Sequence, residues 1–378
     1  MRVLHIGKYY APQRGGIERH LQDLAEWQVR HGVDAGALVH QPPGRWRGTR
    51  EVLNGVSLCR AGCLAAPLYA PLSPDFPWRM SRLIDTWKPD LLHLHLPNPA
   101  CLFVLASRRA RALPWLVHWH ADVSRDVPSR AVRAAYAAYR PFEQATLRRA
   151  EAIIATSQRY LDASSALAGW RSKARVIPLG VAPVAPADAQ HAPDWPDGEG
   201  ARILAVGRLS HYKGFEVLVD ALARTPRGRL LLVGDGEAAG SLQSRVRELG
   251  LDGRVRFVRD LDDDRLAAAY AAADLFVLPS LDRSEAFGLV LLEAMRAGLA
   301  VIASDVRGSA IAHVIGNDAG VLVPPGDADA LAAAITRLDA DDGLRERLAA
   351  AGHRRWQSDF TLDRSARAVL DVYLDLLR

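Results

Sequence analysis

The sequence predicts an α/β protein built from two doubly wound, parallel-sheet domains, and three observations lead to this fold class. At 378 residues the chain has the length of two ordinary domains. Short, nearly continuous apolar runs alternate with segments of helical periodicity along the whole chain, as is typical of parallel βαβ units. A proline-rich stretch without sustained periodicity interrupts the alternation near the middle, at residues 182–200.

Six apolar runs of strand length are expected in each half of the chain. In the first half they are Val3–Gly7, Ala35–His40, Asp90–Leu96, Trp115–His120, Ala152–Ser157 and Arg175–Gly180. In the second half they are Arg202–Gly207, Arg229–Gly234, Arg254–Arg259, Leu275–Ser280, Ala300–Ser304 and Gly320–Pro324. Helical patterns lie between them, for example at Ile17–His31, Arg140–Ala150, Phe215–Ala223, Leu242–Leu249 and Leu266–Ala273. In such sheets ligands bind outside the carboxyl ends of the strands, so the turns that follow strands are the first places to search for chemistry.

These elements predict four segments. Residues 1–181 form a first Rossmann-like domain, 182–200 a linker, and 201–358 a second Rossmann-like domain. Residues 359–378 place apolar side chains at helical spacing, which predicts an amphipathic helix. This helix packs either on its own domain or back on the first one.

The composition excludes several classes of protein. Apolar residues make up 49% of the chain and charged residues 24%, which excludes collagen, a coiled coil and wholesale disorder. Cys59, Cys63 and Cys101 cannot form a disulfide framework, and no zinc spacing is present. No secretory signal and no membrane-spanning apolar run is found, so we expect a cytoplasmic protein.

Charge is distributed unequally between the two halves. Residues 1–180 carry 25 Lys and Arg against 13 Asp and Glu, whereas residues 181–378 carry 23 against 30. Basic residues lie beside aromatic ones in the first half, around Trp46 and in the series Arg125, Val127, Arg130, Arg133, Tyr136, Tyr139 and Arg140. Such a surface fits an anionic membrane leaflet, although solvated arginines on helix faces explain it about as well. Nucleic acid is the weaker alternative because no nucleic-acid-binding motif is present.

Two turns after strands carry features of anion binding. The first contains the doubled glycine Gly15-Gly16 at a helix start, where backbone N–H groups can approach an anion, although a plain strand–helix turn explains it equally well. The second, at the start of the second half, contains Arg208 and Lys213 before a helix. Arginine and lysine together provide the forked and point-charge donors that suit a diphosphate. Lysine is rare here, with only four in the chain, which favours a function for Lys213 over a solvated loop.

A pair of glutamates follows the apolar run Leu275–Ser280. Glu285 is expected in a loop and Glu293 on the second turn of a helix that starts at Gly288 and stops at Gly298. Carboxylates accept hydrogen bonds from the vicinal hydroxyls of ribose or hexose. The N–H groups of Gly288–Val290 would meet phosphates at the helix start. The nearby aspartate run Asp260–Asp264 is interpreted as helix capping rather than as a metal site.

Taken together, these motifs resemble glycosyltransferase family 4. The Glu-x7-Glu pair, GRLSHYKG, GGIERH and VIPLGV carry the resemblance, which extends over nearly the whole chain. It implies the GT-B fold, two Rossmann-like domains facing a cleft, and sugar transfer from a nucleotide donor with retention of anomeric configuration. It also implies that no metal and no cofactor is required, since the nucleotide sugar is a substrate.

The resemblance assigns roles to individual residues. Gly15 and Gly16 approach the donor phosphates and sugar, Arg208 and Lys213 clamp the diphosphate, and His120 lies at the reactive face of the sugar. Glu285 holds sugar hydroxyls and Glu293 holds the ribose. The loop over phosphate and sugar comprises Phe287, Gly288, Leu289 and Val290. Arg259 follows a strand where the family contacts the base.

A narrower resemblance is to bacterial mannosyl- and rhamnosyltransferases of surface-polysaccharide assembly. It is carried by YAPLSPDFP (Tyr69–Pro77), HLHLPNP (His93–Pro99), WLVHWHADV (Trp115–Val123) and YRPFEQATLRRAEAIIATS (Tyr139–Ser157). It implies a GDP-mannose donor, a polyprenyl-diphosphate-linked saccharide acceptor and a peripheral position on the cytoplasmic face of the inner membrane. A nucleotide-sugar epimerase of the same fold and a catalytically silent sugar-nucleotide-binding protein are the alternatives.

Overall fold

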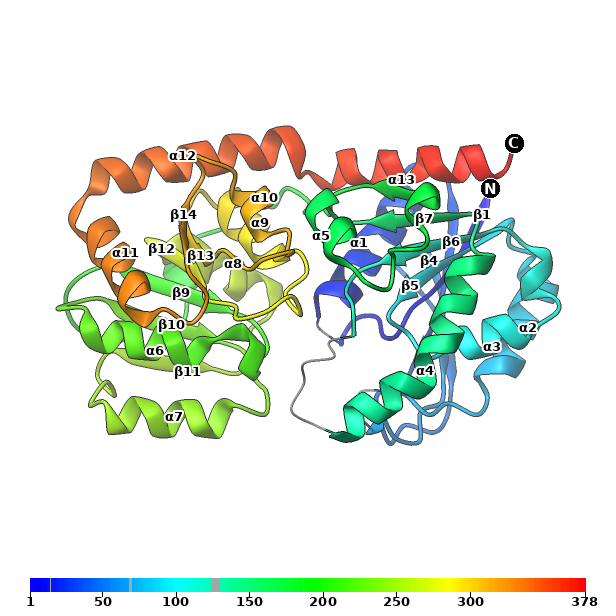
Figure 1. The fold of residues 1–378 in the computed structure, drawn as a ribbon, viewed down its shortest axis with the longest axis horizontal. Coiled ribbons are helices and arrows are strands. Elements are labelled where there is room, and N and C mark those ends of the chain that lie inside the picture. Colours follow the sequence, from blue (N-terminus) through cyan, green and yellow to red (C-terminus); the bar gives the residue numbers. More distant parts are fainter. Residues whose placement is uncertain (14, 68–69, 124–129, 186) are drawn as a thin grey trace. The chain divides into compact units, whose positions relative to one another are not determined.

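The computed structural model describes residues 1–13, 15–67, 70–123, 130–185 and 187–378 (Figure 1). The chain divides into two compact units. The first comprises Met1–Gly180 together with Leu362–Arg378, and the second comprises Val181–Thr361. No helix in the described ranges is long and apolar enough to cross a membrane.

The first unit contains an eight-stranded sheet in the order β3-β4-β2-β1-β5-β6-β7-β8. All neighbouring strands are parallel except the antiparallel pair β3 and β4. The strands are β1 (Arg2–Ile6), β2 (Asp34–His40), β3 (Thr49–Leu53), β4 (Val56–Ala61), β5 (Leu91–Leu96), β6 (Trp115–Trp119), β7 (Ala152–Ala155) and β8 (Ala174–Val176). The α-helices are α1 (Gly16–Arg30), α2 (Phe76–Trp87), α3 (Cys101–Ala106), α4 (Arg130–Arg149), α5 (Gln158–Ala163) and α13 (Leu362–Leu376).

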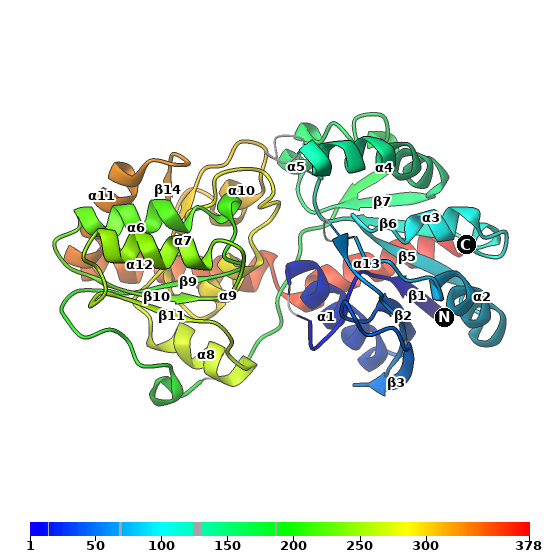
Figure 2. The same cartoon turned by 90° about the horizontal axis from the view of Figure 1, so that it is seen from below.

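The second unit contains a fully parallel six-stranded sheet in the order β11-β10-β9-β12-β13-β14. The strands are β9 (Arg202–Val206), β10 (Arg229–Val233), β11 (Val255–Val258), β12 (Leu275–Leu278), β13 (Ala300–Ser304) and β14 (Val321–Val323). The α-helices are α6 (Phe215–Arg224), α7 (Ala239–Glu248), α8 (Asp263–Ala272), α9 (Leu289–Arg296), α10 (Ile311–Ile315), α11 (Ala328–Ala340) and α12 (Asp342–Asp359). Figure 2 shows α6 and α7 on one side of this sheet and α8 on the other.

The predicted α/β fold class is confirmed, since all twelve predicted runs contain a strand. The two extra strands, β3 and β4, form a hairpin that the sequence analysis missed. Its turn is Asn54-Gly55, and both residues have positive φ angles, 49° and 84°. This is the backbone conformation that a two-residue hairpin turn requires. Helix α4 also begins ten residues before the predicted Arg140.

The C-terminal helix α13 belongs to the first unit, where it packs beside α1. The Trp27 indole donates to Asp363 at 3.2 Å, and the Gln28 amide donates to the Tyr373 hydroxyl at 2.9 Å. Tyr373 and Val369 are fully buried. Residues 182–200, predicted as a linker, fall within the second unit.

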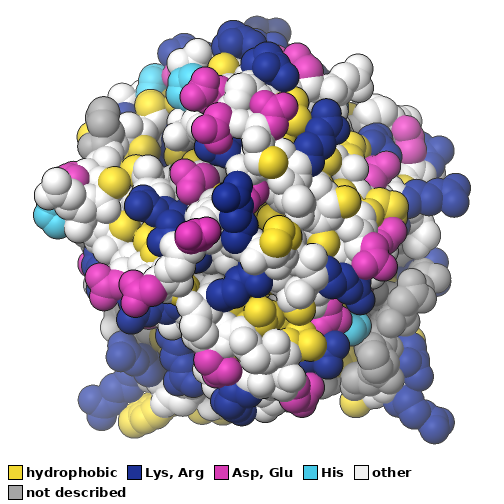
Figure 3. Space-filling model, turned by 90° about the vertical axis from the view of Figure 1, so that its left-hand side faces the viewer, with side chains coloured by type: hydrophobic (Ala, Val, Ile, Leu, Met, Phe, Trp, Pro, Cys, Tyr) yellow, Lys and Arg dark blue, Asp and Glu magenta, His cyan; other side chains and the backbone are white. Residues whose placement is uncertain are grey.

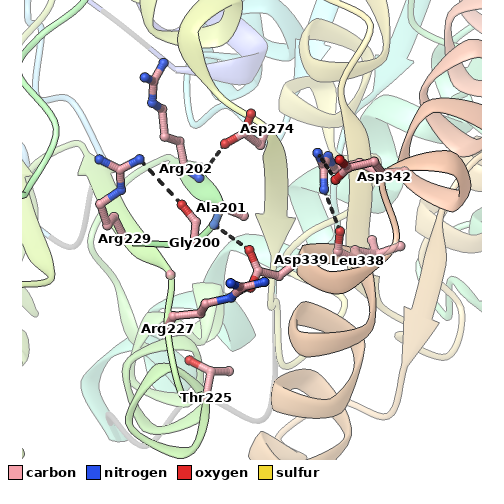
Figure 4. Close-up of polar contacts among 12 residues, drawn as sticks. Gly200, Ala201, Arg202, Thr225, Arg227, Arg229, Asp274, Leu338, Asp339 and Asp342 are labelled. Atoms are coloured by element: carbon pink, nitrogen blue, oxygen red, sulfur yellow. Dashed lines mark hydrogen bonds and ion pairs between the residues drawn. The ribbon is translucent and has the colours of Figure 1, made fainter. Parts of the chain in front are cut away.

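Two aspartates accept hydrogen bonds from the main chain at the amino end of β9 in the second unit (Figure 4). Asp339, at the end of α11, accepts from the main-chain N–H of Ala201 at 2.6 Å and from Arg227 Nε at 2.6 Å. Asp274 accepts from the N–H of Arg202 at 2.7 Å. The amino end of β9 is therefore hydrogen-bonded both to the end of α11 and to the start of its neighbour β12.

We expect Asp339→Ala to lower the free energy of unfolding by about 2–3 kcal/mol, because it leaves the buried Ala201 N–H without an acceptor. Urea denaturation of the two proteins measures the change. The matched control is Asp342→Ala. The Asp342 carboxylate, which forms an ion pair with Arg345, is 77% exposed. This substitution is expected to cost less than about 1 kcal/mol. Equal losses in the two variants would contradict the assignment.

Candidate functional site

A buried ion pair between Lys213 and Glu285 lies at the carboxyl edge of the second sheet. Lys213 Nζ is 2.5 Å from Glu285 Oε2, and both side chains are about nine-tenths buried. Lys213 lies in the turn after β9, and Glu285 lies in the loop after β12. Because β9 and β12 are neighbours while β10 lies on the other side of β9, the pair lies where the strand order reverses. Doubly wound folds bind ligands at this point.

The surroundings keep Lys213 charged and hold Glu285 in place. Burial alone would lower the pKa of Lys213, but the charge of Glu285 and the hydrogen bond to it raise that pKa above its usual value. Ser280 Oγ donates to the same Glu285 oxygen at 3.3 Å, and Ser309 Oγ donates to the Glu285 carbonyl at 2.6 Å. The structure therefore presents a protonated lysine held against a fixed carboxylate.

Arg208 lies on the same side of the sheet. It is exposed in the loop directly after β9, and its positive charge acts to lower the pKa of Lys213. The neighbouring strand ends come unusually close, since a Cβ atom on Gly234 would collide with the carbonyl of Gly207. The two glycines thus let the loop that carries Arg208 and Lys213 fold tightly over the strand ends.

Helix α9 begins directly after Gly288, whose φ angle of 84° favours glycine. Leu289 and Val290 occupy its first turn, where N–H groups have no acceptor within the helix. The Phe287 side chain is buried, only 3% exposed, and packs edge-on against Phe360 with 6.2 Å between the ring centres. The helix start, which has no side-chain cap among the described residues, thus follows the loop that carries Glu285.

Glu293 lies on the second turn of α9 and accepts a hydrogen bond from Tyr270 of α8 at 2.8 Å. Burial and the charge of Glu293 raise the pKa of Tyr270 well above its ordinary value, so the phenol stays a donor. Sequence reasoning missed Tyr270, because its alanine-rich helix carries no signal that points to Glu293. Arg259 is exposed after β11.

The aspartate run is a helix cap, as predicted. The side chain of Asp262 accepts from the N–H of Arg265 at 2.8 Å, at the start of α8.

The first unit contains Gly15, Gly16 and His120. Gly16 is the first residue of α1, and Gly15 precedes it with an extended backbone. His120 follows β6, is 5% exposed, and donates its main-chain N–H to the Leu96 carbonyl at 3.0 Å. Burial, with a smaller electrostatic contribution from the neighbouring His20, lowers the pKa of the His120 imidazole well below 6.5, so it is neutral at neutral pH.

Two doubly wound parallel-sheet units are the architecture of the GT-B fold, and the buried Lys–Glu pair lies at the strand reversal of the second. Residues 15–180 match the family of glycosyl transferase 4-like domains, and residues 188–355 match the glycosyl transferases of group 1. The chain therefore belongs to glycosyltransferase family 4, and it is a hexosyltransferase of that family.

Relatives extend the match over nearly the whole chain. The chain is 28% identical to the O-antigen chain mannosyltransferase C of Escherichia coli, over 100% of this chain and 99% of that protein. It is 31% identical to the phosphatidyl-myo-inositol mannosyltransferase of Mycolicibacterium smegmatis, over 91% and 86% respectively. The solved structure of sucrose-phosphate synthase from Thermosynechococcus elongatus is similar with a TM-score of 0.81 and 28% identity, over 99% of this chain and 98% of that one.

Proposed function

We propose that this chain transfers mannose from GDP-mannose to a lipid-linked saccharide of surface-polysaccharide assembly, with retention of anomeric configuration. The observation that carries the proposal is the buried Lys213–Glu285 pair at the strand reversal of the second sheet. The choice of mannose is supported by the mannosyltransferases among the relatives. The lipid-linked acceptor is supported by the name of the second of these, which acts on phosphatidyl-myo-inositol.

The second unit supplies the groups that such a transfer needs. Lys213 and Arg208 neutralise the charge that develops on the departing nucleoside diphosphate, together with the N–H groups at the start of α9. Glu285, held by Ser280 and Lys213, accepts hydrogen bonds from hydroxyls of the donor sugar. Glu293, oriented by Tyr270, accepts from the ribose hydroxyls, and the backbone near Arg259 faces the base.

The first unit supplies the groups on the side of the reacting sugar. Gly15 and Gly16 let the backbone approach the donor phosphates and sugar, and neutral His120 contacts the sugar. In this mechanism the acceptor hydroxyl attacks the face that the leaving diphosphate vacates. A phosphate oxygen of the donor takes the proton of that hydroxyl. The new glycosidic bond forms as the bond to the nucleoside diphosphate breaks.

A transfer assay tests the proposal. Purified protein is incubated with radiolabelled GDP-mannose and membranes that carry polyprenyl-diphosphate saccharides. Label in the lipid fraction with release of GDP supports the proposal. Interconversion of the donor sugar without acceptor would instead identify an epimerase. Binding of GDP-mannose without release of GDP even in the presence of acceptor would identify a silent binder.

Glu293→Gln is expected to weaken binding of both the nucleoside diphosphate and the nucleotide sugar by about tenfold to a hundredfold, because each contains the ribose. Glu285→Gln is expected to weaken binding of the sugar conjugate alone. Isothermal titration with GDP and GDP-mannose measures both. If Glu293→Gln left GDP binding unchanged, its assignment to the ribose would be wrong.

The proposed membrane contact lies on the first unit. Trp46 and Trp78 are 64% and 57% exposed, with Arg47 stacked 4.8 Å from the first ring centre and Arg82 5.4 Å from the second. Between α2 and α3 lies an open, mostly apolar hollow of about 790 Å³, and Arg108 and Arg109 are among the residues that line it. Arg125 and Val127 of the predicted basic surface, and Tyr69 of the motif Tyr69–Pro77, lie outside the described residues. Figure 3 shows the face at the left-hand side of Figure 1, where acidic and basic side chains are interspersed. This mixture of charges does not form the basic surface that the membrane contact requires.

We expect the protein to sediment with vesicles that contain anionic lipid and not with neutral phosphatidylcholine vesicles. Raising the salt concentration should weaken this binding, because exposed charges are screened. Trp78→Ala should reduce the bound fraction. Equal binding to both kinds of vesicle would contradict the electrostatic contact.

A further inference from the structure

Six buried histidines lie together in the first unit. They come from three neighbouring strands and one helix, and none is more than 5% exposed: His5 of β1, His20 of α1, His93 and His95 of β5, His118 of β6, and His120 just after it. Strand register aligns them, since His5 pairs with His93 and His95 pairs with His118. The two His-x-His sequences therefore place their rings on one face of the sheet.

Ring orientation argues against a metal ion bound jointly by His95, His118 and His120. The nitrogens of His95, His118 and His120 come within 4.8 Å of one another. However, these three rings are stacked with interplanar angles of only 5° to 14°. A ring nitrogen binds a metal through a lone pair in the plane of its ring, so nearly parallel rings do not direct three lone pairs at one ion.

A continuous chain of hydrogen bonds instead connects His120 to the C-terminal helix. His120 Nε2 lies 2.9 Å from His95 Nδ1, and His95 Nε2 lies 3.0 Å from His5 Nδ1. His5 Nε2 then lies 2.8 Å from the Gln28 Oε1 oxygen. The Gln28 amide nitrogen donates to the Tyr373 hydroxyl at 2.9 Å.

This chain has a direction because an amide oxygen can only accept. His5 must donate from Nε2 to Gln28, so its Nδ1 carries the lone pair and accepts from His95 Nε2. His95 Nδ1 in turn accepts from His120 Nε2. His120 therefore holds its proton on Nε2 and its lone pair on Nδ1, and Nδ1 has no hydrogen-bond partner among the described residues.

We propose that Gln28 is a positioning residue that sets the tautomer of His120 through His5 and His95. The orientation of the Gln28 amide, whose nitrogen donates to Tyr373 of α13, is transmitted through three hydrogen bonds to a ring nitrogen more than ninety residues away in sequence. His120 is thereby held with its lone pair on the buried Nδ1. A contact of His120 with the donor sugar belongs to the proposed function, and the tautomer does not depend on it.

The electrostatics of the cluster support this arrangement. The relay requires neutral imidazoles, because a protonated ring would donate from both nitrogens. Burial lowers the pKa of His5 to about 4, and it also lowers the pKa values of His95 and His120 well below 6.5. At neutral pH each ring therefore has one donor nitrogen and one acceptor nitrogen. The single Gln28 amide can then set the tautomers of all three rings.

Long-range ¹H–¹⁵N spectra of histidine-labelled protein test the proposal, because protonated and unprotonated ring nitrogens resonate far apart. The His120 signals are assigned by their loss in His120→Ala. We expect wild-type His120 to be protonated on Nε2 and unprotonated on Nδ1. Gln28→Met removes the acceptor and should give a mixture of tautomers.

The control is His20→Phe, which removes a neighbouring imidazole with no hydrogen bond among the described residues. It should leave the His120 tautomer unchanged. A proton on Nδ1 of wild-type His120, or an unchanged tautomer in folded Gln28→Met, overturns the proposal. The wild-type spectrum decides the first point even if a variant fails to fold. Full transfer activity in His120→Ala would remove the proposed sugar contact and leave the relay standing.

Discussion

Replacing Lys213 with alanine is expected to lower kcat by about 10²–10³-fold, because it removes a fixed positive charge that stabilises the departing diphosphate. The same change leaves the buried Glu285 carboxylate without its partner, which costs about 3–5 kcal/mol of stability. Steady-state kinetics and a thermal melt of the same preparation measure the two effects.

A double variant separates the loss of turnover from the loss of stability. Lys213→Met with Glu285→Gln removes both charges, so the melting temperature should recover while turnover stays low. His211→Ala, an exposed neighbour in the same turn, should keep full activity. Full turnover in Lys213→Ala would remove the diphosphate-clamp assignment.

The first unit is expected to unfold on mild acidification, near pH 5. Burial lowers the pKa values of His5 and His40 to about 4 and that of His20 to about 3, whereas an unfolded histidine titrates near 6.5. Between these values the unfolded state binds more protons, so stability falls as the pH drops below 6.5. At pH 5 each of these three histidines lowers the free energy of unfolding by about 2 kcal/mol. Their sum is comparable to the free energy of unfolding of a typical domain.

Tryptophan fluorescence and circular dichroism between pH 8 and pH 4 measure this transition. His20→Phe should move the midpoint to lower pH, because it removes one of the groups that must stay neutral. A folded first unit at pH 4 would contradict the account of the buried histidines.

The strands were predictable because parallel strands covered on both faces need nearly continuous apolar runs, such as the one that forms β5. The hairpin β3–β4 was missed because β3 is largely exposed and its run is polar, although Asn54-Gly55 carried a turn signal. The start of α4 was missed because its first turns are rich in exposed alanine and arginine.

Part of the site was also predictable. Lys213 and Glu285 could be identified singly from their positions after strands, whereas their direct ion pair depends on β9 and β12 being neighbours. Tyr270 and Tyr373 could not be predicted, because each meets its partner only through helix packing. The His-x-His alternation at His93–His95 and His118–His120 was visible, but the strand register that unites the two pairs was not.

The central claim is that the second unit holds a nucleoside-diphosphate sugar, and a thermal-shift panel tests it most directly. The panel contains GDP, UDP, dTDP and ADP with their common sugar conjugates, since a ligand that binds only the folded state raises the melting temperature. We predict a selective increase with GDP and GDP-mannose that Lys213→Ala diminishes. A selective increase with UDP or dTDP would overturn the choice of mannose donor. The absence of any increase across the panel would contradict the claim itself.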